Sequence, residues 1–233
     1  MAFTAAQVMK RASTILQDAD AIRWTPVELC DWLNEALRAI VAIKPNAKAG
    51  NVILTLAAGT KQTLPEQYTI LSRVLRNIGP TPGNAPGKAI RTLAKRDILD
   101  AQIPGWHDPA VLPATAAVSY VWQDLMALRE FWVAPANDGN GRIEVTVGMI
   151  PTPVTPPSNP LDLDAYTQAV DLPDLFQPII LDMILYRAFS KDSAAPDAAQ
   201  RAGAHMQSAA SGLEALSGGQ NAVSLAAAFA AAG

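Results

Sequence analysis

The feature that most constrains this chain is residues 179–189, whose side chains are apolar almost all the way round the helix that their pattern predicts. Only Asp182 and Arg187 interrupt the apolar character. A helix without a polar face has to be surrounded by other protein. In a chain of 233 residues, this segment should therefore lie centrally among other helices or at a subunit interface.

Asp182 is the unusual side chain in that helix, because a buried carboxylate needs a partner. We expect a hydrogen bond or a salt bridge across helices or across subunits. The alternative is a catalytic acid, but the sequence places no second carboxylate or base near it. We assign Asp182, Arg187 and Trp32 to oligomer or bundle packing.

Near the N-terminus, the pattern predicts one helix over residues 4–18 and a second that begins after Thr25. In the second helix Thr25 is the expected N-cap, Pro26 takes the first helical position and Glu28 the third, which together form a capping box. Apolar side chains fill one half of its helical wheel and polar side chains the other. Lys44-Pro45 should end it, because the residue before a proline is disfavoured in the α region.

The middle of the chain changes to a period of two, which is typical of strands. Strands are expected at residues 51–56, 62–64, 70–78, 88–93, 117–122, 128–134 and 142–149, with a short helix at 94–101. Ala58-Gly59-Thr60 predicts a turn between the first two strands. Asp138-Gly139 and Asn140-Gly141 favour positive φ angles and predict a hairpin between the last two. These strands should form an antiparallel β region in the middle of the chain.

Residues 151–160 contain five prolines and predict a stiff connector. A last amphipathic helix is expected over residues 196–216, ended by Ser217-Gly218-Gly219. The predicted fold class is α+β: a helical bundle from residues 1–48 and 156–216, an antiparallel β insertion at 49–155, and a C-terminal extension at 217–233.

Composition argues against several function classes. Charged side chains make up 17% of the sequence, below the roughly 25% of an average globular protein, which indicates that neighbouring subunits cover much of the surface. The net charge is -3, with no basic cluster of the kind that grips nucleic acid. The N-terminus lacks the pattern of a signal peptide, and no apolar run reaches about 18 residues, so we expect neither a leader nor a membrane anchor.

The residues that could carry chemistry are few and scattered. The single cysteine, Cys30, lies on the apolar face of its helix, and His107 and His205 are far apart in sequence, so we expect no metal and no cofactor. Trp106-His107-Asp108 is interpreted as a loop anchored by its tryptophan rather than as a catalytic His–Asp pair. Asp162 and Asp164 favour a solvated turn over a calcium site. These patterns predict a protein that is not an enzyme.

An ordered set of short motifs resembles one family. Its members are Ile22-Arg23-Trp24-Thr25, Glu28-Leu29, Trp32-Leu33-Asn34-Glu35-Ala36, Gly59-Thr60-Lys61-Gln62, Leu64-Pro65, Arg76-Asn77, Pro104-Gly105-Trp106-His107 and Leu185-Tyr186-Arg187-Ala188-Phe189-Ser190-Lys191-Asp192. Their order and spacing resemble those of tailed-bacteriophage head-to-tail adaptors, also called connector or tail tubular proteins, of the podophage type. The resemblance covers residues 10–195.

The resemblance implies a structural virion protein that is made in the host cytoplasm and forms a dodecameric ring in the neck. The ring would join the portal protein to a tail nozzle or tail tube protein, and genomic DNA would pass through its channel without specific binding. In this family the C-terminal segment commonly reaches into the portal. Leu225 and Phe229, four residues apart among alanines, would form one apolar face of a helical tail and dock on the portal or on a neighbouring subunit.

Two other functions remain open from the sequence. One is a tail or head-completion structural protein outside the adaptor role. The other is a cell-wall hydrolase carried on the particle, which should place two carboxylates, or a carboxylate and a base, in one cleft.

Overall fold

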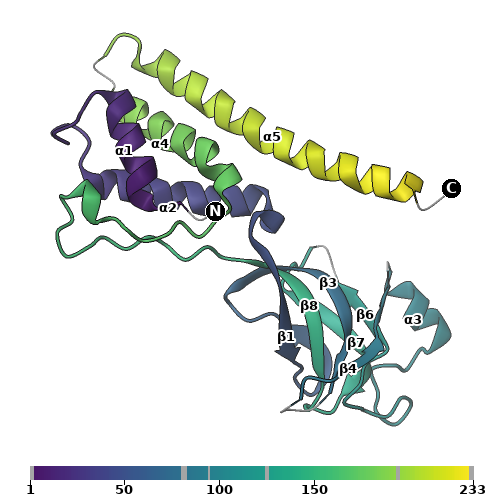
Figure 1. Cartoon of the computed structure of the whole chain (residues 1–233). Coiled ribbons are helices and arrows are strands. Elements are labelled where there is room, and N and C mark those ends of the chain that lie inside the picture. Colours follow the sequence, from purple (N-terminus) through teal and green to yellow (C-terminus); the bar gives the residue numbers. More distant parts are fainter. Residues whose placement is uncertain (1–2, 80–82, 94, 124–125, 193–194, 231–233) are drawn as a thin grey trace. The chain divides into compact units, whose positions relative to one another are not determined.

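The computed structural model describes residues 3–79, 83–93, 95–123, 126–192 and 195–230, with side chains described as far as Leu216. The chain divides into two compact units. Residues 1–47 and 151–233 form one, called the helical unit, and residues 48–150 form the other, called the β unit. The predicted α+β class is confirmed (Figure 1).

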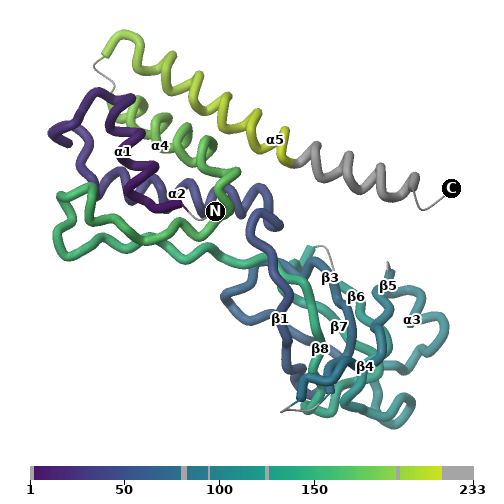
Figure 2. The backbone as a smooth tube through the Cα atoms, viewed as in Figure 1, coloured from purple at the N-terminus to yellow at the C-terminus, as the bar shows by residue number. Residues whose placement is uncertain are grey.

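Helices from both ends of the chain build the helical unit. They are α1 (Ala5–Leu16), α2 (Pro26–Ile43), α4 (Gln177–Lys191) and α5 (Ala198–Ala230), with the 3₁₀ turns η1 (Pro45–Lys48), η2 (Leu163–Ala165) and η3 (Asp174–Phe176). Side chains of all four helices share one apolar core, in which Leu33 of α2 and Ile184 of α4 have no exposed surface. Burying such a side chain stabilises the fold by roughly 1.5–3 kcal/mol. Figure 2 shows α5 running along α4.

The predicted start of α2 is confirmed in detail. The Thr25 hydroxyl accepts a hydrogen bond from the backbone N–H of Glu28 at 3.4 Å, and the Glu28 carboxylate accepts one from the backbone N–H of Thr25 at 3.2 Å. Pro26 occupies the first turn, where its missing N–H costs nothing. The helix ends at Ile43, one residue before Lys44-Pro45, as the proline predicts.

The predicted end of the last helix is wrong. Ser217-Gly218-Gly219 was expected to break it, but α5 continues without interruption to Ala230. Each glycine costs only about 1 kcal/mol relative to alanine inside a helix, and the alanines that follow are the strongest helix formers. The backbone of Leu225 and Phe229 is therefore helical, whereas their side chains lie outside the described part of the chain.

The β unit is a sandwich of two four-stranded sheets. The first has the order β1-β8-β3-β4 and the second β2-β7-β6-β5. The strands are β1 (Ala49–Thr55), β2 (Gly59–Thr63), β3 (Tyr68–Ile78), β4 (Pro86–Ala89), β5 (Arg91–Leu93), β6 (Tyr120–Gln123), β7 (Glu130–Asn137) and β8 (Arg142–Met149). Val145 of β8 and Val133 of β7, both without exposed surface, meet in the core between the sheets.

The two predicted hairpins, between β1 and β2 and between β7 and β8, are wrong, because in each case the two strands lie in different sheets. β8 pairs with β1 and β3, whereas β7 pairs with β2 and β6, so the turn at 138–141 carries the chain from one sheet to the other. Gly139 does adopt the expected positive φ, at 92°. β1 and β2 likewise belong to different sheets. The predicted strand at 88–93 divides at Ile90 into β4 and β5, and β5 pairs with β6 in parallel, which corrects the expectation of a wholly antiparallel region.

Three buried amide side chains tie the loops of the β unit to its strands. Gln62 binds the backbone of Ala57 and Gly59, and Asn77 binds that of Lys88 and Val118. Asn137 donates to the carbonyl oxygens of Thr115 and Ala116 and accepts from the N–H groups of Gly139 and Gly141. Buried polar groups persist only when they are hydrogen-bonded, so these contacts fix where the loops lie.

Candidate functional site

The sequence singled out Trp32 of α2 and Asp182 and Arg187 of α4, and the structure places all three in the helical unit. Trp32 is half-buried and packs against the core. Arg187 binds Glu35 of α2 at 3.0 Å, with both side chains about half exposed. Asp182 faces α5. The assignment of these residues to oligomer or bundle packing stays a prediction.

The C-terminal end of α4 is held by the loop before α2 and by the first turns of that helix. Trp24 donates its indole N–H to the Ala188 carbonyl at 3.2 Å, and Arg23 forms an ion pair with the buried Asp192. Lys191 binds the Glu28 carboxylate at 2.5 Å, and this hydrogen bond lowers the pKa of Glu28. Sequence reasoning missed these pairs, because nothing in the local pattern says which helix faces which.

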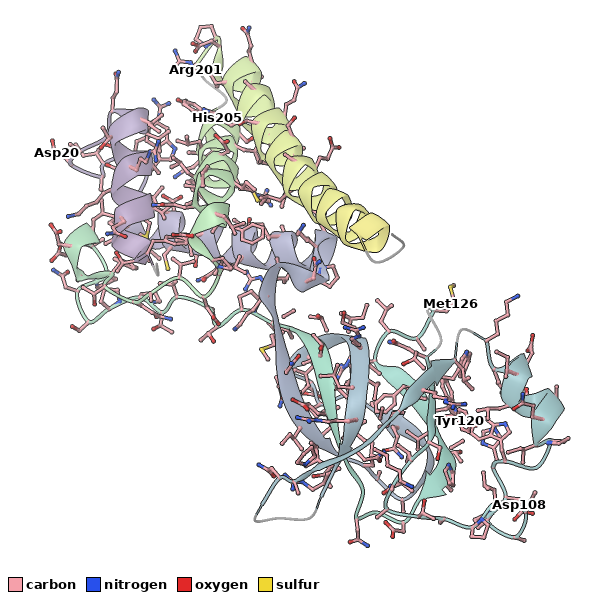
Figure 3. The ribbon with its side chains drawn as sticks, turned by 45° about the vertical axis from the view of Figure 1, so that its right-hand side comes forward. Asp20, Asp108, Tyr120, Met126, Arg201 and His205 are labelled. Carbon is pink, nitrogen blue, oxygen red and sulfur yellow. The ribbon has the colours of Figure 1, made fainter. Side chains whose placement is uncertain are left out.

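The contact between α4 and α5 is built around Asp182. One of its carboxylate oxygens lies 2.8 Å from Nδ1 of His205, and the other accepts a hydrogen bond from the Ser208 hydroxyl at 2.7 Å. The His205 ring stacks on Phe189 of α4, with ring centres 5.6 Å apart, and Arg201 lies over the same phenyl ring. Figure 3 labels His205 and Arg201. The apolar helix is therefore covered by α5, and its carboxylate has partners there.

Ser208, His205 and Asp182 are the residue types of a hydrolytic triad, but their geometry differs from one. The hydroxyl and the imidazole both bind the same carboxylate, and no hydrogen bond joins Ser208 to His205 among the described residues. Nucleophilic catalysis requires the base to contact the nucleophile. The arrangement fits a packing contact better than a catalytic one.

Asp182→Asn is expected to lower the free energy of unfolding by about 1–3 kcal/mol, because one of its two acceptor oxygens becomes a donor. The measurement is urea unfolding of the free chain. Ser208→Ala is the matched control, since it removes only an exposed hydrogen bond and should cost less than about 1 kcal/mol. Unchanged stability in Asp182→Asn would contradict the packing role, and so would a hydrolase activity that this substitution abolished.

Trp106-His107-Asp108 does not form a catalytic pair. Trp106 has no exposed surface and donates its indole N–H to Asp100 of α3 (Asp97–Gln102) at 2.9 Å. His107 Nδ1 lies 2.8 Å from the Thr60 hydroxyl, and Asp108 accepts the Ala110 N–H instead. Burial, together with the charge of Arg96, lowers the pKa of His107. The tryptophan anchors this loop over the second sheet.

Other candidate chemistry is accounted for by local structure. Burial, reinforced by the nearby Asp31, raises the pKa of the Cys30 thiol to about 11, which makes it a poor nucleophile at neutral pH. Asp162 caps the 3₁₀ turn η2, and Asp164 pairs with Lys10. Within the described ranges, no group of three or more His, Cys, Asp or Glu is placed to hold a metal ion.

Comparison with known families decides the identity of the chain. The model of the SU10 adaptor protein family matches residues 3–229, which is nearly the whole sequence. The chain belongs to the SU10 adaptor protein family. The resemblance to head-to-tail adaptors is thereby confirmed at the level of the family. A comparison of the sequence with curated proteins finds no match.

The fold explains two of the motif blocks that pointed to the adaptors. The block at residues 22–36 and the block at residues 185–192 are distant in sequence, yet they meet through the Arg23–Asp192, Glu28–Lys191 and Glu35–Arg187 pairs. In this adaptor these motif residues thus fasten α2 to α4. No helix in the described part of the chain is both long and apolar enough to cross a membrane.

Proposed function

We propose that the chain forms a ring beneath the portal of a tailed bacteriophage. The ring joins the DNA-filled head to the tail nozzle or tail tube and continues the channel for genomic DNA, without binding that DNA specifically. The family match over residues 3–229 is the observation that carries this proposal. The role is structural and lies in the neck of the virion, and the chain performs no catalysis there.

Exposed apolar side chains support association with other subunits. Ile22 is 83% exposed, Leu161 69% and Ile43 67%, all in the helical unit. Leu161 lines a surface pocket together with Ala21, so the backbone segment that carries Ile22 passes beside it. Large apolar side chains left exposed are common at protein–protein contacts. In the ring, neighbouring copies or the portal would cover them.

Native mass spectrometry with and without the portal protein tests the proposal. The free chain should be monomeric or weakly associating, and it should form a dodecameric ring on the portal, because contacts with neighbours add stability only where subunits are brought together. A stable free dimer closed by a two-fold axis would contradict the ring, since its interface would use the same patch on both copies. Failure to bind the portal would contradict the adaptor role itself.

A further inference from the structure

A cleft of about 550 Å³ opens in the β unit where the two sheets end. Lys88 of β4, Arg91 of β5 and the hydroxyl-bearing Ser119 and Tyr120 are among its lining residues, and none of the lining residues is an Asp or Glu. Tyr120 marks the position of the cleft in Figure 3. With Thr115, which also lines it, the cavity has two cationic and three hydroxyl-bearing residues, and this lining suits an anionic group.

The strands that carry the two cations are held in place, and the cations themselves are not neutralised. Arg91 lies opposite Tyr120 in the parallel pair of β5 and β6, and its backbone N–H binds the Ser119 carbonyl at 3.0 Å. Lys88 and Arg91 are exposed, and neither forms an ion pair within the described residues. An anion that entered the cleft would therefore find two charges without a carboxylate partner.

Asn77 builds the cleft without binding its contents. Its amide nitrogen donates to the carbonyl oxygens of Lys88 and Val118, at 3.0 and 2.8 Å, and its oxygen accepts the Val118 N–H at 2.8 Å. These bonds use the donors and the acceptor of the buried amide and fix β4 relative to the segment before β6. Asn77 is thus a positioning residue, which holds the strand that carries Lys88.

The helical unit of the same chain carries acidic side chains that could bind these cations. The helical unit has five more acidic than basic side chains, whereas the β unit has two more basic than acidic ones. Asp20, Asp31 and Glu214 of the helical unit are exposed, and none of them forms a hydrogen bond or ion pair within the described part. Complementary charge on two parts of one chain favours a head-to-tail contact between copies, which closes into a ring.

We propose that the cleft binds carboxylate side chains from the helical unit of a second copy of this chain. The proposal rests on the ring proposed above and names one of the contacts between its neighbours. Lys88 and Arg91 supply the charge, Ser119 and Tyr120 supply hydroxyl hydrogen bonds, and Asp20, Asp31 and Glu214 are the candidate carboxylates.

Cross-linking of mixed isotopes tests the contact directly. Equal amounts of the full chain in light and heavy isotopic forms are treated with a carbodiimide, which joins a lysine amine to a carboxylate with loss of water. The reaction is run on the concentrated chain alone and on the chain bound to portal. We expect links from Lys88 to Asp20, Asp31 or Glu214, with light–heavy pairs among them. Links within one chain only, or no link from Lys88 in either sample, overturn the proposal.

Charge reversal gives an independent readout. Lys88→Glu with Arg91→Glu should weaken association between copies about tenfold or more, and a Lys substitution at the linked carboxylate of the other copy should restore it. Arg73→Glu with Lys95→Glu is the matched control, because it makes the same change in net charge outside the cleft. Equal loss in the control would overturn the proposal. Portal binding is scored separately, so failure of this contact is distinguishable from failure of the adaptor role.

Discussion

Gly141→Ala is expected to destabilise the β unit by about 3–6 kcal/mol, from overpacking and from buried polar groups left unpaired. A Cβ at this position would lie 2.0 Å from the Asn137 amide nitrogen and 2.4 Å from the Ala116 carbonyl oxygen. The Asn137 side chain cannot move away without losing its bonds to Thr115, Ala116, Gly139 and Gly141. The new methyl group and the buried amide therefore compete for the same space.

Thermal unfolding, followed by near-ultraviolet circular dichroism, measures the effect. Three of the five tryptophans, Trp106, Trp122 and Trp132, lie in the β unit and report on its packing. Gly203→Ala is the control. Gly203 lies in α5 with nothing within 4 Å of its Cβ position, so the substitution should stabilise the helix by about 0.5–1 kcal/mol. Gly141→Ala with wild-type stability would show that Asn137 does not pack as described.

Asn137→Ala adds a second check on the same contact. It removes the side chain that the new methyl group would strike, so Gly141→Ala should cost less in that background than in the wild type. Residues that share a contact show such non-additive effects, whereas distant residues do not. If the losses of stability in the two variants simply add, Gly141→Ala does not act through a clash with Asn137.

The two glycines of this turn show how far local sequence reaches. Asp138-Gly139 predicts a positive φ, and Gly139 has one. Asn140-Gly141 was also expected to favour a positive φ. What requires a glycine at position 141 is instead the close approach of Asn137, at the end of β7, and of Ala116, in the segment before β6. A backbone preference belongs to a residue and its neighbours, whereas a close approach depends on residues far apart in sequence.

The same distinction explains which parts of the fold were predictable. The capping box of α2 and the alternating apolar residues of β8 are local, and both are confirmed. The partners of β7 and β8 were not predictable, because a turn signal marks a change of direction but does not say which strand will pair. β8 lies between β1 and β3, and β7 pairs with the distant β2 as well as with its sequence neighbour β6.

Candidate site residues follow the same rule. The sequence identified Asp182 because a carboxylate in an apolar helix needs a partner, and the structure supplies His205 and Ser208. It did not identify Lys88 or Arg91, because an isolated cation in a strand pattern is an ordinary exposed residue. Their meeting depends on β4 and β5 lying at the edges of two different sheets, which only the topology shows.

Truncation after Leu216 is expected to leave the stability of the free chain nearly unchanged while strongly weakening its attachment to filled heads. Among the described side chains of α5, Ala202, Ala209 and Leu213 are buried and Leu216 is partly buried, and all four stay in the truncated chain. The removed segment contains few polar side chains, so it is poorly suited to remain exposed to water without a partner. We propose that it stabilises the particle by docking on the portal or a neighbouring copy.

Leu225→Asp with Phe229→Asp should reproduce the effect of the truncation, because the two side chains are four residues apart and share one face of a helix. A carboxylate in an apolar interface loses its hydration without gaining a partner. Asn221→Asp with Ser224→Asp is the matched control, which adds the same charge to the same segment while keeping both apolar residues, and it should attach more tightly. The measurement is the fraction of filled heads that retain their DNA after incubation with each variant. If the truncated chain joins heads and retains DNA as well as the full chain does, the segment has no role in docking and Leu225 and Phe229 are not its anchor.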